Sequence, residues 1–277
     1  MTDFTIDNII INALHEDMPN GDVTVDNLIP ETEISLAKLI SKDCGVISGI
    51  EVFKRVFKLL DENIEVNLLV KDGQRVENRQ LLATLHGKTQ TILKGERVAL
   101  NLLQRMSGIA TETSKYVREC VKPCEILDTR KTMPNLRILD KKAVRDGGAT
   151  NHRYCLSDMV MIKDNHIDAC GSITNAVKLA KEKTHGVKIE VEVETIEQFK
   201  EALKTPCDWI MLDNMNNEMM AECVKLNNHN KKLEASGNMT LERINSVSSL
   251  GVDYISVGAL THSVKAFDIS LKFHDIK

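Results

Sequence analysis

From residue 125 onward, six short apolar runs each end in polar or charged residues, and helix-like segments separate them. The runs end near residues 128, 162, 192, 213, 235 and 257. The later ends lie about twenty-one to thirty residues apart, which accommodates one strand and one helix, the repeat of parallel βαβ units. We therefore predict an α/β barrel of about six parallel strands, whose strand ends form a rim that carries the functional residues.

An open doubly wound sheet fits this pattern less well. No GxGxxG motif opens the first unit, and polar residues follow every apolar run rather than those at a single switch point. The barrel is therefore the preferred architecture for the second half of the chain.

The first part of the chain follows another pattern. Strand-like runs and turns fill residues 34–88 around a predicted helix at 50–62, and a long helix is predicted over 93–120. We expect a mixed α/β domain over residues 1–111, followed by the barrel domain over 112–277, with a last helix that packs on the N-terminal domain.

One segment of the N-terminal region suggests a non-enzymatic alternative. Residues 70–87, VKDGQRVENRQLLATLHG, have the turn-and-strand rhythm of a biotinyl or lipoyl carrier module. Such carriers present a lysine at a tight hairpin tip, and no such lysine follows here. The segment is therefore interpreted as structural.

Composition argues against several classes of protein. The net charge of -4 and an aromatic content of 4% leave no basic stripe with stacking platforms, so nucleic-acid binding is not expected. No basic region precedes an N-terminal apolar stretch, and no apolar window approaches the roughly eighteen residues of a spanning helix, so we predict a cytoplasmic protein without membrane contact. The seven cysteines form no CxxC pair and predict no disulfide framework.

Cationic side chains gather around the first two apolar runs. Arg130 and Lys131 follow the first run, Lys163 follows the second, and His152 and Arg153 lie just before the second. If these segments face one cavity, that cavity binds an anion.

Carboxylates follow the next two runs. Glu190, Glu192 and Glu194 alternate, so they share one face of their strand, and Asp213 ends the very apolar run WIML. A lone buried carboxylate there would be costly without a cation or metal partner. Carboxylates on neighbouring strands beside phosphate oxygens are a usual way to hold Mg²⁺.

Glycine-bearing turns follow the last two runs. Ser236 and Gly237 precede one predicted helix, and Gly258 lies in the turn after the last run. Such turns let backbone amides approach a phosphate, and phosphate sites of α/β barrels tend to follow the last two strands.

Eight motifs together resemble one enzyme family. They are GERVALNLLQRMSGIAT, DTRKTMP, GGATNHRYCLSD, MIKDNHI, VEVE, LDN, LEASGN and GVDYISVGALTHS. In this order, and over nearly the whole chain, they are similar to quinolinate phosphoribosyltransferases, the nicotinate-nucleotide pyrophosphorylases (carboxylating) of NAD synthesis. The resemblance implies an N-terminal α/β sandwich domain, a C-terminal α/β barrel and a homodimer, with higher oligomers left open.

The resemblance also implies roles for individual residues. Quinolinate binds to cations that match Arg130, His152, Arg153 and Lys163, and Arg97 reaches in from the partner subunit. Lys131, beside phosphoribosyl pyrophosphate (PRPP), is catalytic together with Glu192 and Asp213, which also hold Mg²⁺ directly or through water and PRPP. The phosphate contacts match Ser236, Gly237, Asn238, Ser256, Gly258 and His262.

Two residues depart from the family pattern: Asn238 stands where a glycine is expected, and Cys155 lies at a variable position. Asparagine tolerates left-handed backbone geometry better than most residues. The implied reaction transfers phosphoribose from PRPP to quinolinate with loss of CO₂. A related phosphoribosyltransferase of the same fold, such as a molybdenum-transport-associated paralogue or a nicotinate phosphoribosyltransferase, is the nearest alternative.

Overall fold

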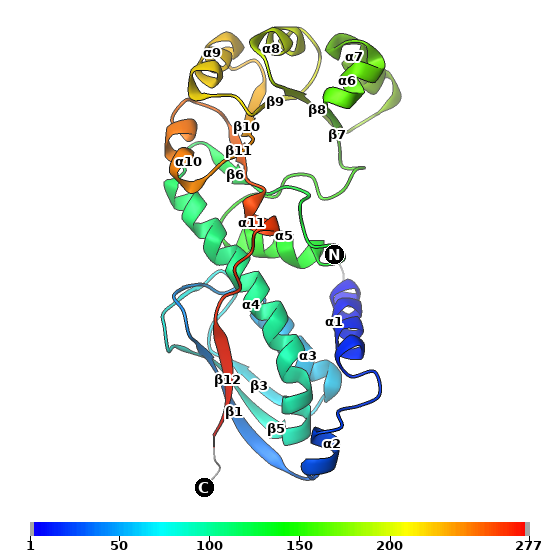
Figure 1. Cartoon of the computed structure of the whole chain (residues 1–277), viewed down its shortest axis with the longest axis vertical. Coiled ribbons are helices and arrows are strands. Elements are labelled where there is room, and N and C mark those ends of the chain that lie inside the picture. Colours follow the sequence, from blue (N-terminus) through cyan, green and yellow to red (C-terminus); the bar gives the residue numbers. More distant parts are fainter. Residues whose placement is uncertain (1–2, 275–277) are drawn as a thin grey trace. The chain divides into compact units, whose positions relative to one another are not determined.

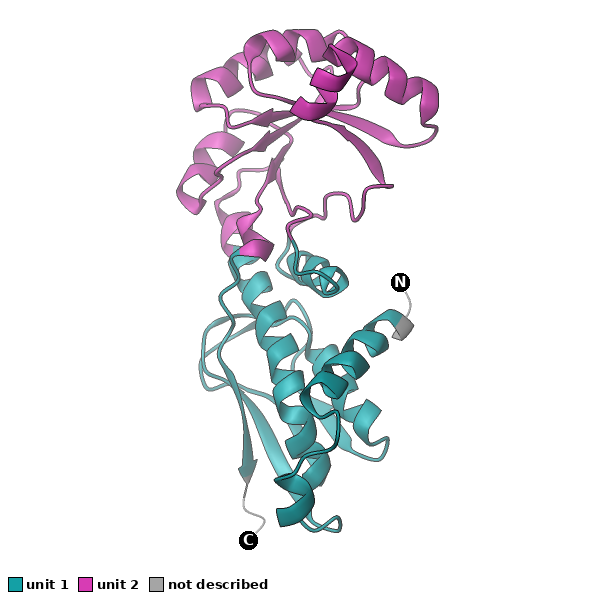
Figure 2. Ribbon diagram, turned by 45° about the vertical axis from the view of Figure 1, so that its right-hand side comes forward, with its two compact units in different colours: residues 1–114, 132–148, 263–277 teal, residues 115–131, 149–262 magenta. Residues whose placement is uncertain are grey.

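The computed structural model describes residues 3–274 and divides the chain into two compact units. Unit 1 comprises residues 1–114, 132–148 and 263–277, and unit 2 comprises residues 115–131 and 149–262 (Figure 2). Both units combine helices with a sheet, so the predicted α/β class is confirmed.

Unit 1 contains an antiparallel sheet in the order β12-β1-β5-β3. Its strands are β1 (Ile34–Ser41), β3 (Glu65–Leu68), β5 (Leu81–Lys88) and β12 (Ile269–His274). A second, two-stranded ladder pairs β2 (Gly45–Val46) with β4 (Arg75–Val76). The carrier-like segment therefore supplies β4 and β5 of this unit.

Helices α3 (Ile50–Leu60) and α4 (Thr89–Glu119) lie beside the four-stranded sheet (Figure 1). Helix α3 buries Phe53, Val56 and Phe57, which recur at helical spacing. This spacing explains why a helix could be predicted here from the sequence. A side chain at Gly95 of α4 would collide with the Phe57 ring at 2.7 Å, so glycine permits α3 and α4 to approach closely. Helices α1 (Asp3–Asp17) and α2 (Val25–Leu28) precede the sheet.

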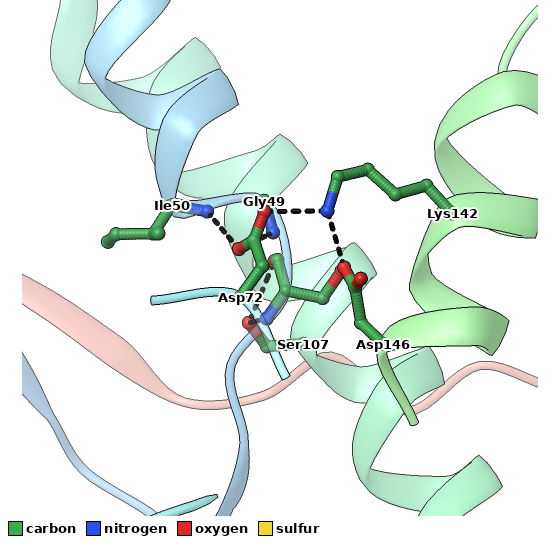
Figure 3. Close-up of polar contacts among 7 residues, drawn as sticks. Gly49, Ile50, Asp72, Ser107, Lys142 and Asp146 are labelled. Atoms are coloured by element: carbon green, nitrogen blue, oxygen red, sulfur yellow. Dashed lines mark hydrogen bonds and ion pairs between the residues drawn. The ribbon is translucent and has the colours of Figure 1, made fainter. Parts of the chain in front are cut away.

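Helix α5 (Arg137–Asp146) belongs to unit 1, although it lies between two strands of the barrel in sequence. Lys142 Nζ lies 2.6 Å from Asp72 Oδ2 and 2.6 Å from Asp146 Oδ2 (Figure 3). Arg105 donates two hydrogen bonds, of 2.9 and 2.8 Å, to the fully buried Asp140. These ion pairs fix α5 within unit 1.

Unit 2 is built around a parallel six-stranded sheet in the order β6-β11-β10-β9-β8-β7. Its strands are β6 (Glu125–Leu127), β7 (Met159–Ile162), β8 (Lys188–Val193), β9 (Trp209–Asp213), β10 (Lys232–Ser236) and β11 (Tyr254–Ser256). The strand ends lie within two residues of the predicted positions. Strands β6 and β7 occupy the two ends of the order, so the sheet is a barrel-like arch rather than a fully paired barrel.

Helices follow the strands of unit 2 and cover the outer side of the arch (Figure 1). They are α6 (Asp164–Cys170), α7 (Ile173–Lys183), α8 (Ile196–Leu203), α9 (Asn217–Asn227) and α10 (Leu241–Ser248). The short α11 (Ala259–His262) follows β11 and lies apart from this outer row. This strand–helix alternation is the predicted βαβ repeat.

The chain does not divide simply at residue 111. Residues 132–148 and 263–277 join unit 1, and the last element is strand β12 rather than the expected helix. Strand β12 pairs with β1 and alternates, with Ile269 and Leu271 buried and Lys272 exposed. This period of two fits a strand, and the partner that completes it lies more than two hundred residues away in sequence.

Candidate active site

A cavity of about 400 Å³ opens among the carboxyl ends of the unit 2 strands. Its lining includes these predicted site residues: Arg130, Lys131, His152, Arg153, Lys163, Glu192, Asp213, Ser236 and Ser256. Because the strands are parallel, residues that end or directly follow them gather at one edge of the sheet. The expectation that the cationic segments face one cavity is thus met.

Local sequence signals place the carboxylates at this edge. Immediately after β8, the Thr195 side chain accepts the N–H of Gln198, whose side chain accepts the Thr195 N–H, so a capping box begins α8 there. After β9, Asn216 caps α9 by accepting the Met219 N–H at 2.8 Å. The chain therefore turns from strand to helix within a few residues of Glu192 and Asp213.

Arg130 and Arg153 bring like charges together in the cavity. The buried Nε of Arg130 has no hydrogen-bond partner within the described part of the chain. Burial, followed by the charge of Arg130, lowers the pKa of Arg153, whose Nη1 donates to the Met159 carbonyl at 2.9 Å. A ligand with adjacent carboxylates would supply the hydrogen-bond acceptor that Arg130 Nε lacks, and its negative charge would offset the repulsion between the two arginines.

The cationic and acidic sides of the cavity meet at an ion pair. Lys163 Nζ donates to Glu192 Oε2, and Glu192 lies on the strand adjacent to β7. Asp213, on the next strand, accepts a 2.7 Å hydrogen bond from the Asn214 side chain. Carboxylate oxygens are therefore available on two adjacent strands, although Glu192 is shared with a lysine.

His152 lines the cavity but turns its ring towards two buried carboxylates. Its Nε2 lies 3.1 Å from Glu190 Oε2 and 3.2 Å from Glu234 Oε2. Burial lowers the pKa of His152, but hydrogen bonds to these glutamates and their charges outweigh burial and raise the pKa to about 10. Burial, together with the charge of Glu234, raises the pKa of Glu190 to about 7.

Two glycine turns border the cavity. Gly237 has φ +86°, and a side chain there would overlap the Asn214 side chain. Asn238 has φ +47°, so this asparagine does adopt the left-handed geometry that glycine would provide. A side chain at Gly258 would lie 3.1 Å from both Lys131 Cδ and His262 Cδ2, so this glycine allows Lys131 and His262 to approach each other.

Several predicted site residues do not themselves line the cavity. Gly237, Asn238, Gly258 and His262 belong to turns that adjoin lining residues, and their phosphate contacts remain predictions. Arg97 is exposed on α4 in unit 1 and remains a predicted contribution from a partner subunit. Cys155 also lies outside the lining, with its Sγ 3.0 Å from Ser157 Oγ and 3.0 Å from Asp158 Oδ1.

Sequence reasoning missed several lining residues: Asp128, Thr129, Met161, Met211 and Glu234. All five precede a predicted site residue by two positions, as Met161 precedes Lys163 and Glu234 precedes Ser236. Side chains two apart on a strand share a face, so the alternation could have identified this inner layer. Asp128 has a further role, because its carboxylate accepts the His152 N–H at 2.8 Å and the Asn151 side chain at 2.7 Å.

Both halves of the chain match one protein family. Residues 22–107 match the quinolinate phosphoribosyl transferase N-terminal domain, and residues 109–272 match the C-terminal domain of the same family. A Bacillus subtilis (strain 168) protein named probable nicotinate-nucleotide pyrophosphorylase (carboxylating) is 48% identical over 92% of this chain and 89% of its own length. A Nicotiana tabacum protein named quinolinate phosphoribosyltransferase (decarboxylating) 2b, mitochondrial, is 45% identical over 94% of this chain and 80% of its own.

Solved structures show the same relationship. The crystal structure of NadC from Streptococcus pyogenes superposes with a TM-score of 0.95 at 39% identity and covers 99% of both chains. A human nicotinic acid phosphoribosyltransferase structure, with a TM-score of 0.65 at 9% identity over 99% of this chain and 74% of its own, shares the fold alone. From the domain matches, the sequence identities and the common structure together, the chain belongs to the quinolinate phosphoribosyltransferase family.

Proposed function

We propose that the unit 2 cavity binds quinolinate beside PRPP and converts them to nicotinate mononucleotide, pyrophosphate and CO₂. This is the reaction of a nicotinate-nucleotide pyrophosphorylase (carboxylating), a pentosyltransferase of de novo NAD biosynthesis. The observation that carries the proposal is the unpartnered, buried Nε of Arg130 near the charge of Arg153, on the cationic side of a cavity whose other side is acidic.

Quinolinate is a pyridine with two adjacent carboxylates, and the cationic side of the cavity suits it. The guanidinium groups of Arg130 and Arg153 can each donate two parallel hydrogen bonds to a carboxylate, and Lys163 adds a point charge. His152 also lines the cavity, but both of its ring nitrogens are engaged, Nε2 by the two glutamates and Nδ1 by the Arg153 N–H, so its role is to support the pocket. Because the two arginines and Lys163 bind carboxylates, the ring nitrogen of quinolinate remains free to react.

The ring nitrogen attacks C1 of the phosphoribosyl group with its lone pair. The bond from C1 to the pyrophosphate oxygen breaks, and its electron pair leaves with pyrophosphate. Glu192 and Asp213 favour the positive charge that develops on the ribosyl carbon, while Lys131 lies beside the phosphates. Ser236, Ser256, the turns at Gly237 and Gly258, and His262 are assigned to phosphate binding.

Decarboxylation follows from the charge that the first step creates. The alkylated ring nitrogen is positive, so it stabilises the electron pair left on the adjacent carbon when its carboxylate departs as CO₂. A proton from water then completes nicotinate mononucleotide. The substrate supplies its own electron sink, and the protein is required only to hold the ring in place.

The acidic side of the cavity fits Mg²⁺ bound together with PRPP. Glu192 and Asp213 offer the oxygen donors that Mg²⁺ prefers, and the ion commonly takes only one or two protein ligands beside phosphates and water. When bound, Mg²⁺ would neutralise charge on the departing pyrophosphate. Because Glu192 is engaged by Lys163, Asp213 is the less encumbered of the two donors.

The active enzyme is proposed to be a homodimer in which Arg97 completes the partner's quinolinate site. The family resemblance and the exposure of Arg97 on α4 support this assignment. Across residues 3–274, no helix combines the length and the apolar character needed to cross a bilayer. A cytoplasmic location remains a prediction from the sequence.

The test is to incubate the pure protein with quinolinate, PRPP and Mg²⁺ and to measure nicotinate mononucleotide and CO₂. Nicotinate in place of quinolinate is the matched control, because it lacks the second carboxylate and should be a poor substrate. Preferred use of nicotinate, or no product from quinolinate, would overturn the proposal in favour of a related phosphoribosyltransferase.

A further inference from the structure

Two buried glutamates lie on the inner face of the sheet and have no part in the reaction described above. Glu190 on β8 and Glu234 on β10 are both 0% exposed, and β9 lies between their strands. Their carboxylates nevertheless approach the same atom, His152 Nε2, at 3.1 and 3.2 Å. The arrangement joins two strands, β8 and β10, to one ring.

This arrangement is energetically demanding. Each buried carboxylate loses several kcal/mol of hydration, and one N–H cannot satisfy both. Glu190 Oε1 and both oxygens of Glu234 lack a hydrogen bond within the described region, although Glu234 Oε2 faces Nε2. The two carboxylates therefore compete for the same hydrogen, and both hold the ring at Nε2.

The histidine and the two glutamates also lie close enough to hold a metal ion, and the hydrogen bonds of the ring describe a second role for them. The carboxylates favour an imidazolium, whereas the Arg153 N–H, 2.7 Å from Nδ1, favours a neutral ring that accepts through Nδ1. In both states Nε2 carries the hydrogen that faces the glutamates. With this hydrogen in place, the ring is held by the glutamates.

A third buried carboxylate, that of Asp128, fixes residues 151–153, the segment that contains His152. Asp128 accepts the His152 N–H at 2.8 Å and the Asn151 side chain at 2.7 Å. The Arg153 N–H donates in turn to the His152 ring. Residues 151–153 are thus held through their backbone and through the ring, while the Arg153 guanidinium reaches the cavity.

We propose that Glu190 and Glu234 are positioning residues for the dicarboxylate pocket, which hold the His152 ring and thereby keep Arg153 beside Arg130 before substrate binds. This inference rests on the proposed function. The charge of Glu190 acts on Arg153, but among the described residues no hydrogen bond joins either glutamate to the two arginines. The glutamates therefore offset repulsion between the arginines and, unlike a direct salt bridge, do not occupy the guanidinium donors that quinolinate would use.

The first test uses Glu190→Gln, Glu234→Gln and the double variant. Glutamine keeps the shape and an acceptor oxygen but removes the charge. Calorimetry with quinolinate alone should show affinity reduced by about threefold in the single variants and about tenfold or more in the double variant, the range of a lost charge-assisted contact. The KM for PRPP should stay within about twofold of wild type, since the pocket for PRPP lies on the acidic side. Glu194→Gln, exposed just beyond β8, is the matched control and should behave as wild type.

The second test measures the protonation of the His152 ring directly. ¹⁵N NMR of labelled protein, with the His152 signal assigned by its loss in His152→Gln, should show a protonated Nε2. That signal should shift in Glu190→Gln and Glu234→Gln but not in Glu194→Gln. A ring protonated on Nδ1 alone would overturn the anchoring geometry, whatever the activity.

The outcomes separate this inference from the proposed function. If wild-type protein fails to bind and convert quinolinate, the proposed function fails, while the NMR experiment still tests the anchor. If wild type is active and the folded double variant binds quinolinate normally, the positioning role is wrong. Equal losses of quinolinate and PRPP affinity would also overturn it, because they would indicate general structural damage.

Discussion

Lys163 and Glu192 form an ion pair inside the cavity, at the ends of the adjacent strands β7 and β8. These residues were predicted to serve different substrates, Lys163 for quinolinate and Glu192 for PRPP and Mg²⁺. The cationic side of the cavity, assigned to quinolinate, and the acidic side, assigned to PRPP, therefore meet at this ion pair. If Lys163 binds quinolinate as predicted, the substrate must share or replace Glu192 as its partner, which lowers the net gain from that lysine.

Replacing Lys163 with alanine should weaken quinolinate binding by about tenfold. A hydrogen bond to a charged group contributes about 1.5–3 kcal/mol, and the existing pair with Glu192 moves the expected loss towards the lower end. Calorimetry with quinolinate alone measures the effect. The exposed Lys178→Ala on α7 is the control for loss of a positive charge, and a wild-type affinity in Lys163→Ala would show that this lysine does not bind the substrate.

Replacing Asp213 with asparagine should lower kcat on the order of 10²-fold, the usual effect of losing one electrostatic contact to a transition state. The Mg²⁺ concentration needed for half-maximal rate should rise, because the remaining donor, Glu192, is paired with Lys163. Quinolinate affinity measured alone should change little. If Asp213→Asn lost only quinolinate affinity, the assignment of the acidic side to PRPP would be wrong; Asp168→Asn, on the exposed side of α6, is the control.

Much of unit 2 could be predicted because its signals are local. Each strand is a short apolar run, and cap residues such as Thr195 and Asn216 begin the following helices immediately afterwards. The rim residues followed from the strand ends. The two-residue alternation also placed Glu190 on the same face as Glu192, and the same step applied inward from Ser236 would have identified Glu234.

The position of two segments could not be predicted from local pattern. Helix α5 lies in unit 1 because Asp140 pairs with Arg105 and Lys142 with Asp72, which lie 35 and 70 residues away. Strand β12 is completed by β1, at the other end of the chain. No local spacing indicates such partners, so the simple division of the chain at residue 111 missed both segments.

The pair between Arg105 and Asp140 should matter more for stability than an ordinary surface ion pair. Asp140 is fully buried and also accepts the Met133 N–H at 3.0 Å, so Asp140→Ala removes the carboxylate that accepts two hydrogen bonds from the largely buried Arg105 guanidinium. We expect a loss of about 3–5 kcal/mol in the free energy of unfolding, measured by urea denaturation. The double variant Arg105→Met/Asp140→Leu should recover much of this loss. The exposed Glu62→Ala should change stability by about 0.5 kcal/mol or less, and a similarly small change in Asp140→Ala would contradict the anchor.

Stability should fall as the pH rises from about 6.5 to 10. The folded-state pKa of His152 is raised from 6.5 to about 10, so the protonated ring stabilises the fold fully below pH 6.5 and this contribution disappears as pH passes through the folded pKa. The folded-state pKa of Glu190 is raised from 4.5 to about 7, so its protonated form also stabilises the fold, and this contribution to the free energy of unfolding is lost as the pH rises from about 4.5 to 7. Urea denaturation at each pH should show a shallower decline between pH 6.5 and 10 in His152→Gln than in wild type. Equal slopes would mean that the ring is already neutral, as the Arg153 N–H contact favours.

The shared site of the proposed homodimer makes a quantitative prediction about Arg97. If Arg97 serves the partner's site and Lys163 serves its own subunit's site, mixing Arg97→Ala with Lys163→Ala subunits creates heterodimers with one doubly damaged site and one intact site. With complete exchange and random pairing, about half of the dimers are mixed, so activity should return to roughly a quarter of wild type.

Each variant alone should remain nearly inactive at limiting quinolinate, and subunit exchange is verified by native mass spectrometry of differently labelled chains. Mixing Lys131→Ala with Lys163→Ala is the matched control, because both lesions lie in unit 2 and no intact site can form unless the cavity itself is shared. Verified exchange without recovery in the Arg97 mixture would place Arg97 in its own subunit's site or outside the site altogether.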